Sequence, residues 1–166
     1  MSEILRIFIA VLILTISLAT YFLAITAMFQ QRVTKTKTVI ETIPGRSFGV
    51  GLVNFLFFFV IAFVLLAFAE RVQSGVVKWI VTIPALIVIA FLTIILSFGL
   101  TAMATFVGEK TFSDVSSWKQ VSFGTVILCF ASAFPFVGWF LFLPYISFVS
   151  IGAFILGVFQ REPKVS

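Results

Sequence analysis

Four long runs without a charged residue dominate this sequence and restrict what the chain can fold into. They cover residues 7–31, 47–69, 79–108 and 120–160, which together make 119 of the 166 residues. A helix needs about 20 predominantly apolar residues to cross a hydrocarbon core of roughly 30 Å. Each of the first three runs therefore predicts one membrane-spanning helix, and the third run is long enough to tilt or to extend past the core.

The composition excludes an ordinary water-soluble domain. Hydrophobic residues make up 61% of the chain and charged residues 10%, whereas soluble domains carry about 25% charged residues. Disorder is excluded for the same reason, since disordered chains are poor in apolar residues. There is no His, and Cys129 is the one cysteine, so neither an intrachain disulfide nor a Cys/His metal cluster is possible. These features indicate an integral membrane protein.

The fourth run, of 41 residues, is too long for one crossing, because as a single helix it would extend about 60 Å. Pro135, Gly138 and Trp139 in its middle favour a turn at the membrane interface. We therefore predict a hairpin, with one helix kinked at Pro135 as the alternative. The expected fold is all-α, a polytopic transmembrane helical bundle in a single domain, 1–166. Its five predicted spans lie at about 7–29, 47–69, 80–107, 116–134 and 139–159.

Two local features leave alternatives open. The apolar stretch of the first run is longer than the 7–15 residues of a signal peptide, which favours a retained signal-anchor helix over a cleaved leader. Pro84 and Pro144 lie about five residues into their runs. Each suits either the first turn of a helix or a kink within one.

The distribution of Lys and Arg predicts the orientation. With five spans and the N-terminus outside, eight basic residues lie on the inner side and three on the outer side, whereas four spans would divide them six against five. Inner loops of membrane proteins are the ones enriched in Lys and Arg. The expected location is therefore the cell membrane, with the N-terminus outside and the C-terminus cytoplasmic.

The first loop carries Arg32, Lys35, Lys37 and Arg46. These residues mark topology, and the alternative is that they dock acidic lipid head-groups or an acidic partner. Binding to nucleic acid is not predicted. The alternation of Thr, Lys and β-branched residues over 32–42 also suggests a short extended segment.

Small and hydroxyl-bearing residues recur at helical spacing within the predicted spans, which is typical of helix-packing faces. The packing candidates are Asn54, Thr93, Ser97, Thr101, Gly108, Ser147, Ser150 and Gly157. A hydroxyl-lined path for a small solute is the alternative interpretation. Asn54, the most polar side chain inside a span, is expected to bond a neighbouring helix, with coordination of an ion as the alternative.

No Asp, Glu, Lys or Arg falls within the core of a predicted span, so catalysis, a metal and a cofactor are not predicted. The expected function is that of a non-enzymatic integral membrane scaffold or accessory subunit. Its expected partners are membrane lipids and either other membrane proteins or further copies of the chain. The alternative is a channel or permease for a small neutral solute.

The last ninety residues resemble small bacterial membrane domains that occur fused to, or beside, bactofilins, the β-helical cytoskeletal polymers. The resemblance is carried by residues 82–87 at a helix start, 106–110 at its end, the turn 134–139 and the Gly-containing segment 150–155. It implies a bacterial source and a partnership with a bactofilin. Because the sequence carries no bactofilin domain, that partnership would act in trans.

Overall fold

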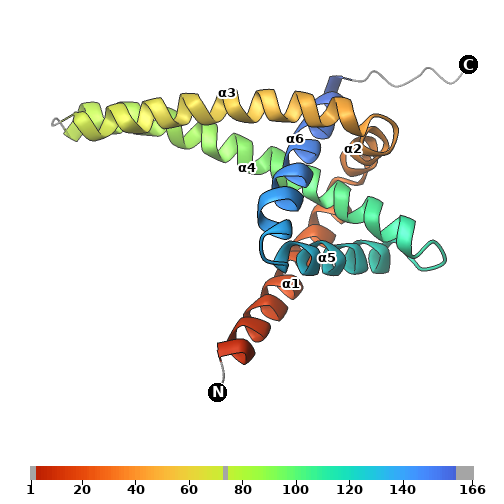
Figure 1. Ribbon diagram of the computed structural model, residues 1–166. Helices are drawn as coiled ribbons and strands as arrows, with labels where there is room; N and C mark the ends of the chain where they lie inside the picture. Colours follow the sequence, from red (N-terminus) through yellow and green to blue (C-terminus); the bar gives the residue numbers. More distant parts are fainter. Residues whose placement is uncertain (1–2, 73–74, 160–166) are drawn as a thin grey trace, which may run out of the picture.

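The chain is built from helices only, within residues 3–72 and 75–159, which the computed structural model describes. Their order is shown in Figure 1. The segments are α1 (Glu3–Met28), α2 (Gln30–Thr42), α3 (Pro44–Arg71), α4 (Gly75–Thr111), α5 (Ser117–Ala133), the π-helix η1 (Val137–Phe142) and α6 (Leu143–Phe159). The predicted all-α class is therefore confirmed. Arg161 and Lys164, which entered the charge count, lie outside the described residues.

Four helices of the described part are long and apolar enough to cross a membrane: Leu5–Met28, Pro44–Arg71, Gly75–Thr111 and Val137–Phe159. They correspond to four of the five predicted spans. The remaining predicted span, 116–134, is represented by α5, which has 17 residues. At 1.5 Å per residue α5 is about 25 Å long, short of a core of roughly 30 Å. The number of five crossings is therefore not confirmed.

The expectation of an extended segment over 32–42 is wrong, because these residues belong to helix α2. Val33, Thr36, Val39 and Ile40 are buried. They follow one another at three, three and one residues, so they form one face of a helix. That face packs against α4 and α6, and burying it stabilises helical structure despite the low helix propensity of Val, Ile and Thr.

Two prolines, Pro44 and Pro144, lie at the start of a helix, and a third, Pro84, lies inside one. Ile43, before Pro44, has a φ of −139° and separates α2 from α3, whose first turn contains Pro44. Pro disfavours helical geometry in the preceding residue and is well tolerated in a first turn. Pro84 lies inside α4, nine residues after its start, so it is not part of a first turn. Pro144 is the second residue of α6, directly after η1.

Helix α4 is the centre of the molecule, since it contacts α1, α2, α3, α5 and α6. Around it a core of small and β-branched residues is buried, including Val39, Ala102, Ala104, Val121 and Val149. Helix α6 packs most extensively on α3 and also contacts α4 and α2. The short distances between these helices depend on small side chains.

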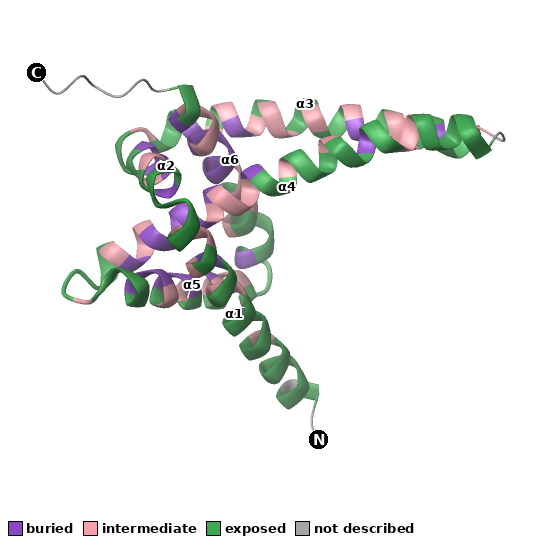
Figure 2. Cartoon of the chain, turned by 180° about the vertical axis from the view of Figure 1, so that it is seen from behind, coloured by how far each residue is buried: buried purple, intermediate pink, exposed green. Residues whose placement is uncertain are grey.

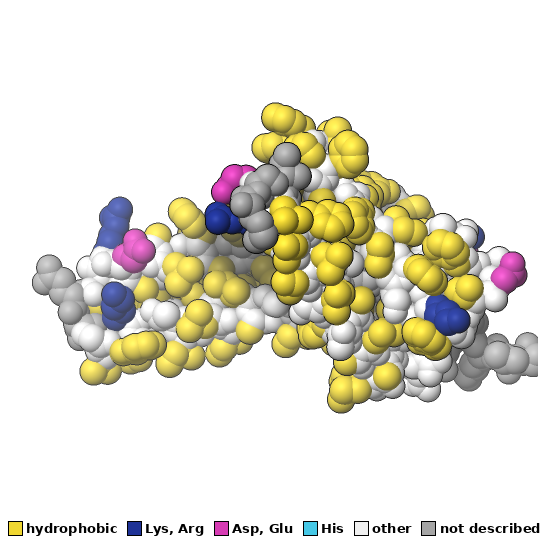
Figure 3. All heavy atoms as spheres, turned by 90° about the horizontal axis from the view of Figure 1, so that it is seen from below, with side chains coloured by type: hydrophobic (Ala, Val, Ile, Leu, Met, Phe, Trp, Pro, Cys, Tyr) yellow, Lys and Arg dark blue, Asp and Glu magenta, His cyan; other side chains and the backbone are white. Residues whose placement is uncertain are grey.

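Helices α3 and α4 continue side by side beyond this core as a projecting arm, which we define as residues 56–71 and 75–94 (Figure 1). The N-terminal half of α1 projects separately, and both projections are largely exposed (Figure 2). Most of their exposed side chains are apolar, for example Phe63 and Ile13. Figure 3 shows hydrophobic side chains over much of one face, with charged groups mainly near the ends.

Candidate functional site

The closest helix contact is the crossing of α3 and α6. A Cβ atom on Gly51 would collide with the backbone carbonyl of Phe148, and a Cβ atom on Gly152 would collide with that of Ser47. Ser47 is fully buried beside this contact. Small residues four apart on one helix thus let another backbone approach, as in membrane helix pairs.

The same relationship recurs where α4 crosses α5. A Cβ atom on Gly108 would collide with the carbonyl of Gln120, and a Cβ atom on Gly124 would collide with that of Ala104. Gln120 is buried and its side-chain amide donates to the carbonyl of Phe112 at 3.1 Å, across the turn between the helices. Gly108, a predicted packing residue, therefore lies at a helix contact.

Three other predicted packing residues are also buried. Thr101 and Ser150 are fully buried, and Gly157 lies 3.6 Å, measured from an added Cβ atom, from Thr36 of α2. Ser150 lies against Gly99 at the crossing of α4 and α6. Among the described residues its hydroxyl is buried without a hydrogen-bond partner. The contact with Gly99 therefore depends on small size rather than on hydrogen bonding.

Three hydroxyl-bearing residues lie four apart on α4, namely Thr93, Ser97 and Thr101, and we call them the hydroxyl stripe. Each forms a hydrogen bond within its own helix. Thr93 donates to the carbonyl of Ile89, Ser97 to that of Thr93, and Thr101 to that of Ser97, each at 2.8 Å. Thr93 is exposed and Ser97 half-buried, so the stripe runs from the arm into the core. Ser147 on α6 is half-buried. The three hydroxyl groups of the stripe therefore already donate their protons to carbonyls of α4.

Asn54 does not bond a neighbouring helix as expected. Its side-chain amide donates to the carbonyl of Val50, one turn earlier in α3, at 2.8 Å. The residue is half-buried at the wall of a groove between α2, α3, α4 and α6. The expectation was based on the polarity of Asn54 inside a span, which does not determine whether its partner lies on a neighbouring helix or on its own helix.

Two ion pairs join α2 to the end of α4, and we call these four residues the α2–α4 clasp. Lys37 pairs with Glu109 at 2.6 Å, and Lys110 pairs with Glu41 at 2.9 Å. The hydrogen bond from Lys110 and the attraction of its charge hold the pKa of the Glu41 carboxyl below its ordinary value. The ammonium group of Lys37 is thus already paired with a carboxylate of the same protein.

The other three predicted docking residues are distributed along the same segment. Arg32 and Lys35 belong to α2, and Arg46 lies in the first turn of α3. Arg32 and Arg46 are exposed and Lys35 is half-buried. Of the four predicted docking residues, Arg32 and Arg46 are therefore the exposed ones, whereas Lys35 is half-buried and Lys37 is paired with Glu109.

The turn predicted at Pro135, Gly138 and Trp139 is present, but its geometry differs from the expectation. Phe136, not Gly138, has the positive φ, at 65° with a ψ of −66°. The amide of Val137 donates to the carbonyl of Pro135 at 2.9 Å, which makes a γ-turn of the rare, strained form. Gly138 is instead needed for close approach, because a Cβ atom there would lie 2.6 Å from the carbonyl oxygen of Ser132.

Helices α5 and α6 do not form the expected side-by-side hairpin. After the turn, η1 contacts α5, while α6 leaves at an angle and packs on α3 and α4 (Figure 1). The single kinked helix is also wrong, because Phe134 is extended and no helix continues through it. Helix η1 has the wider π geometry, in which the Leu143 amide donates to the carbonyl of Gly138, five residues earlier, and α6 begins directly after it.

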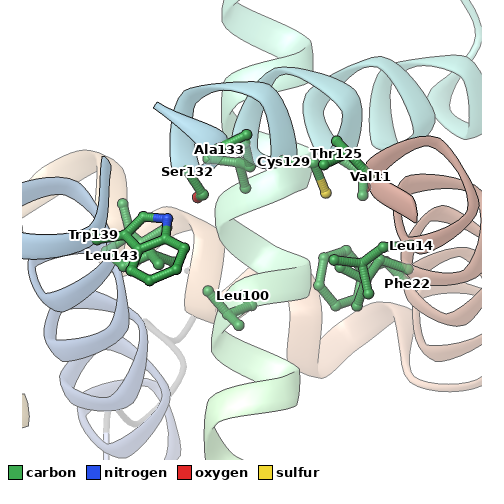
Figure 4. A pocket seen from close by; sticks show the side chains of 13 residues that line it. Val11, Leu14, Phe22, Leu100, Thr125, Cys129, Ser132, Ala133, Trp139 and Leu143 are labelled. Atoms are coloured by element: carbon green, nitrogen blue, oxygen red, sulfur yellow. The ribbon is translucent and has the colours of Figure 1, made fainter. Parts of the chain in front are cut away.

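Beside this turn lies a cavity of about 360 Å³ between α1, α4, α5, η1 and α6, shown in Figure 4. Trp139 and Leu143 close one side, Cys129 and Thr125 another, and Phe22 and Leu14 a third. The Thr125 hydroxyl donates to the carbonyl of Val121. The cavity is lined almost entirely by apolar groups, which suits an apolar chain or a neighbouring side chain.

Apart from the Cys129 thiol, no ionisable side chain lines this cavity, so its walls offer no carboxylate and no basic side chain to a bound molecule. Within residues 3–72 and 75–159 there is no group of three His, Cys, Asp or Glu side chains close enough to hold a metal ion. No known protein family, curated protein or solved structure matches the chain. The resemblance to bactofilin-associated membrane domains therefore stays a prediction.

Proposed function

We propose that this protein is a non-enzymatic integral membrane scaffold or accessory subunit that packs against partner membrane proteins. The observation that carries this proposal is the exposure of the projecting helices. The most apolar 18-residue windows of α1, α3 and α4 are each 11% buried, against 39% for the last apolar helix. Helices that diverge from a core leave long apolar faces, which other transmembrane helices cover by close packing.

The proposed arrangement in the membrane is five crossings, with the N-terminus outside and the C-terminus cytoplasmic. The α2–α4 clasp supports two of these crossings, those of α3 and α4, because it holds the first and third loops together at one end of the molecule. These loops share a side when the helices between them, α3 and α4, both cross. Helix α5 is then the shortest crossing, and the turn at Phe136 faces outside.

Cysteine labelling from outside tests this topology. Thr38→Cys and Val137→Cys, each in a Cys129→Ala background, use positions that are exposed in the fold. Only the cysteine at 137 is expected to react with an impermeant reagent. Reaction at position 38 alone would show the opposite orientation. Equal reaction at both positions would place the two sites on one side of the membrane and would contradict five crossings.

A catalytic function is not proposed, since the carboxylates nearest the bundle are already paired. Glu109 and Glu41 each bind a lysine of the clasp. A channel or permease for a small neutral solute remains the alternative. It is less well supported, because Thr101 is fully buried and the α4 hydroxyls donate to their own helix.

The mass of the purified protein tests the scaffold proposal. After extraction in a mild detergent, light scattering should report a protein mass well above the 18.4 kDa of one chain. The double variant Phe63→Ala/Phe68→Ala, which removes two exposed aromatic side chains from the arm, should reduce that mass. A particle of one chain that recovers no second protein would contradict the proposal.

A further inference from the structure

A second cavity, of about 570 Å³, lies between α2, α3, α4 and α6, and we call it the Phe groove. Nine of its eleven lining residues are apolar and six of these are phenylalanines. The two polar residues are Arg32 and Asn54. A volume of this size falls in the range of ligand sites, and an apolar lining with few polar groups is their usual composition.

Aromatic contacts form the walls of the Phe groove along its length. The rings of Phe29 and Phe98 lie 5.2 Å apart, those of Phe98 and Phe154 lie 5.3 Å apart, and those of Phe58 and Phe91 lie 5.6 Å apart. Phe91 and Phe98 are seven residues apart on α4, which corresponds to about 10 Å along the helix axis. The groove is therefore elongated, as an extended hydrocarbon chain requires.

Arg32 lies at the α2 end of the Phe groove and is exposed. Within residues 3–72 and 75–159 its guanidinium forms no ion pair, whereas Lys37 and Lys110 each have a carboxylate partner. Arginine binds phosphate well, because its planar guanidinium donates two parallel hydrogen bonds. The groove thus combines a long apolar wall with one cation beside it.

We propose that the Phe groove binds one anionic phospholipid, with its phosphate against Arg32 and an acyl chain along the phenylalanines. Charge selects the occupant, because the lining of the groove contains one positive group and no negative one. Anionic lipids also concentrate at the side of a membrane where basic residues of this kind gather. This site does not depend on the proposed packing against partner proteins.

Native mass spectrometry of the delipidated protein in detergent tests the site. The probes are dioleoylphosphatidylglycerol and dioleoylphosphatidylcholine, which share acyl chains and differ in net charge. The wild type should bind phosphatidylglycerol more tightly, and Arg32→Gln should weaken this binding by about fivefold, the effect of one basic residue near an anionic lipid. Arg32→Lys should retain most of the preference.

Three controls separate the groove from general attraction of charges. Arg71→Gln removes a basic residue at the far tip of α3 and should leave binding unchanged. Val158→Trp fills the groove and should weaken both lipids. Glycerophosphoglycerol, the head-group without acyl chains, should not compete. Equal binding of the two lipids, equal effects of Arg32→Gln and Arg71→Gln, or competition by the head-group alone would each overturn the proposal.

Discussion

Gly51 of α3 and Gly152 of α6 occupy reciprocal places at one helix crossing, since each lies against the backbone carbonyl four residues before the other. Gly108 of α4 and Gly124 of α5 have the same relationship at a second crossing. The first crossing joins α3 to α6, and the second joins α4 to α5. At both crossings a side chain larger than glycine would collide with the backbone of the neighbouring helix.

Adding one methyl group at the first crossing should destabilise the protein. Gly152→Ala places a Cβ atom against the carbonyl of Ser47, and overpacking of this kind costs about 1–3 kcal/mol. Thermal unfolding in detergent, followed by the loss of helical signal, measures the change. Gly49→Ala is the matched control, because nothing lies within 4 Å of a Cβ atom there. It should be neutral or stabilising by up to about 1 kcal/mol. Equal melting of the two variants would contradict the crossing.

Charge reversal tests the α2–α4 clasp. Lys37→Glu should lower stability by about 1 kcal/mol, because the Lys37 side chain is only 19% exposed beside Glu109. Adding Glu109→Lys should restore most of the loss, and the two single changes and the double change form a thermodynamic cycle. Arg6→Glu breaks the exposed pair with Glu3 and should change little. A double variant no more stable than Lys37→Glu would show that the pair does not join the helices.

Acid should weaken the second ion pair of the α2–α4 clasp, between Lys110 and Glu41. The pKa of Glu41 is lowered in the folded protein, by its hydrogen bond from Lys110 and by the charge of that lysine, from an ordinary value of 4.5. The ion pair therefore contributes its full stabilisation of the folded protein above pH 4.5. This contribution is lost as the pH falls below 4.5 and passes the lowered pKa that Glu41 has in the folded protein. A melting temperature measured against pH should fall less over this range in Glu41→Gln than in the wild type. Parallel profiles would exclude a contribution from Glu41.

The turn before η1 should become more stable with glycine. Phe136 adopts a positive φ and is 77% exposed, so Phe136→Gly relieves strain while removing few contacts. A gain of about 1 kcal/mol is expected in thermal unfolding. Phe134→Gly is the contrasting change, because Phe134 has an ordinary extended backbone and glycine there should be destabilising. A loss of stability in Phe136→Gly would contradict the strained turn.

Much of the fold follows from the uncharged runs, because hydrophobic length alone predicts α1, α3, α4 and a break near Pro135. Helix α2 was missed because its Thr and Val residues have low helix propensity, although Val33, Thr36 and Ile40 follow helical spacing. The reciprocal glycines at 51 and 152 were not paired in advance, since a sequence does not show which helices cross. The sequence indicated a turn near Pro135 and Gly138, but it did not indicate that Phe136 has the positive φ or that Gly138 lies close to the backbone of Ser132.

Cross-linking in the intact membrane tests the central claim, that the exposed helices pack against other membrane proteins. A photoreactive amino acid replaces Phe63 on the outer face of the arm, which is 64% exposed, and a second variant carries it at Ile13 of α1, which is 61% exposed. The control carries it at Thr42, on the exposed end of α2. Illumination should give a discrete protein adduct from 63 or 13, with a second copy or another membrane protein, and none of that size from 42. Adducts with lipid alone at both 63 and 13 would contradict the claim.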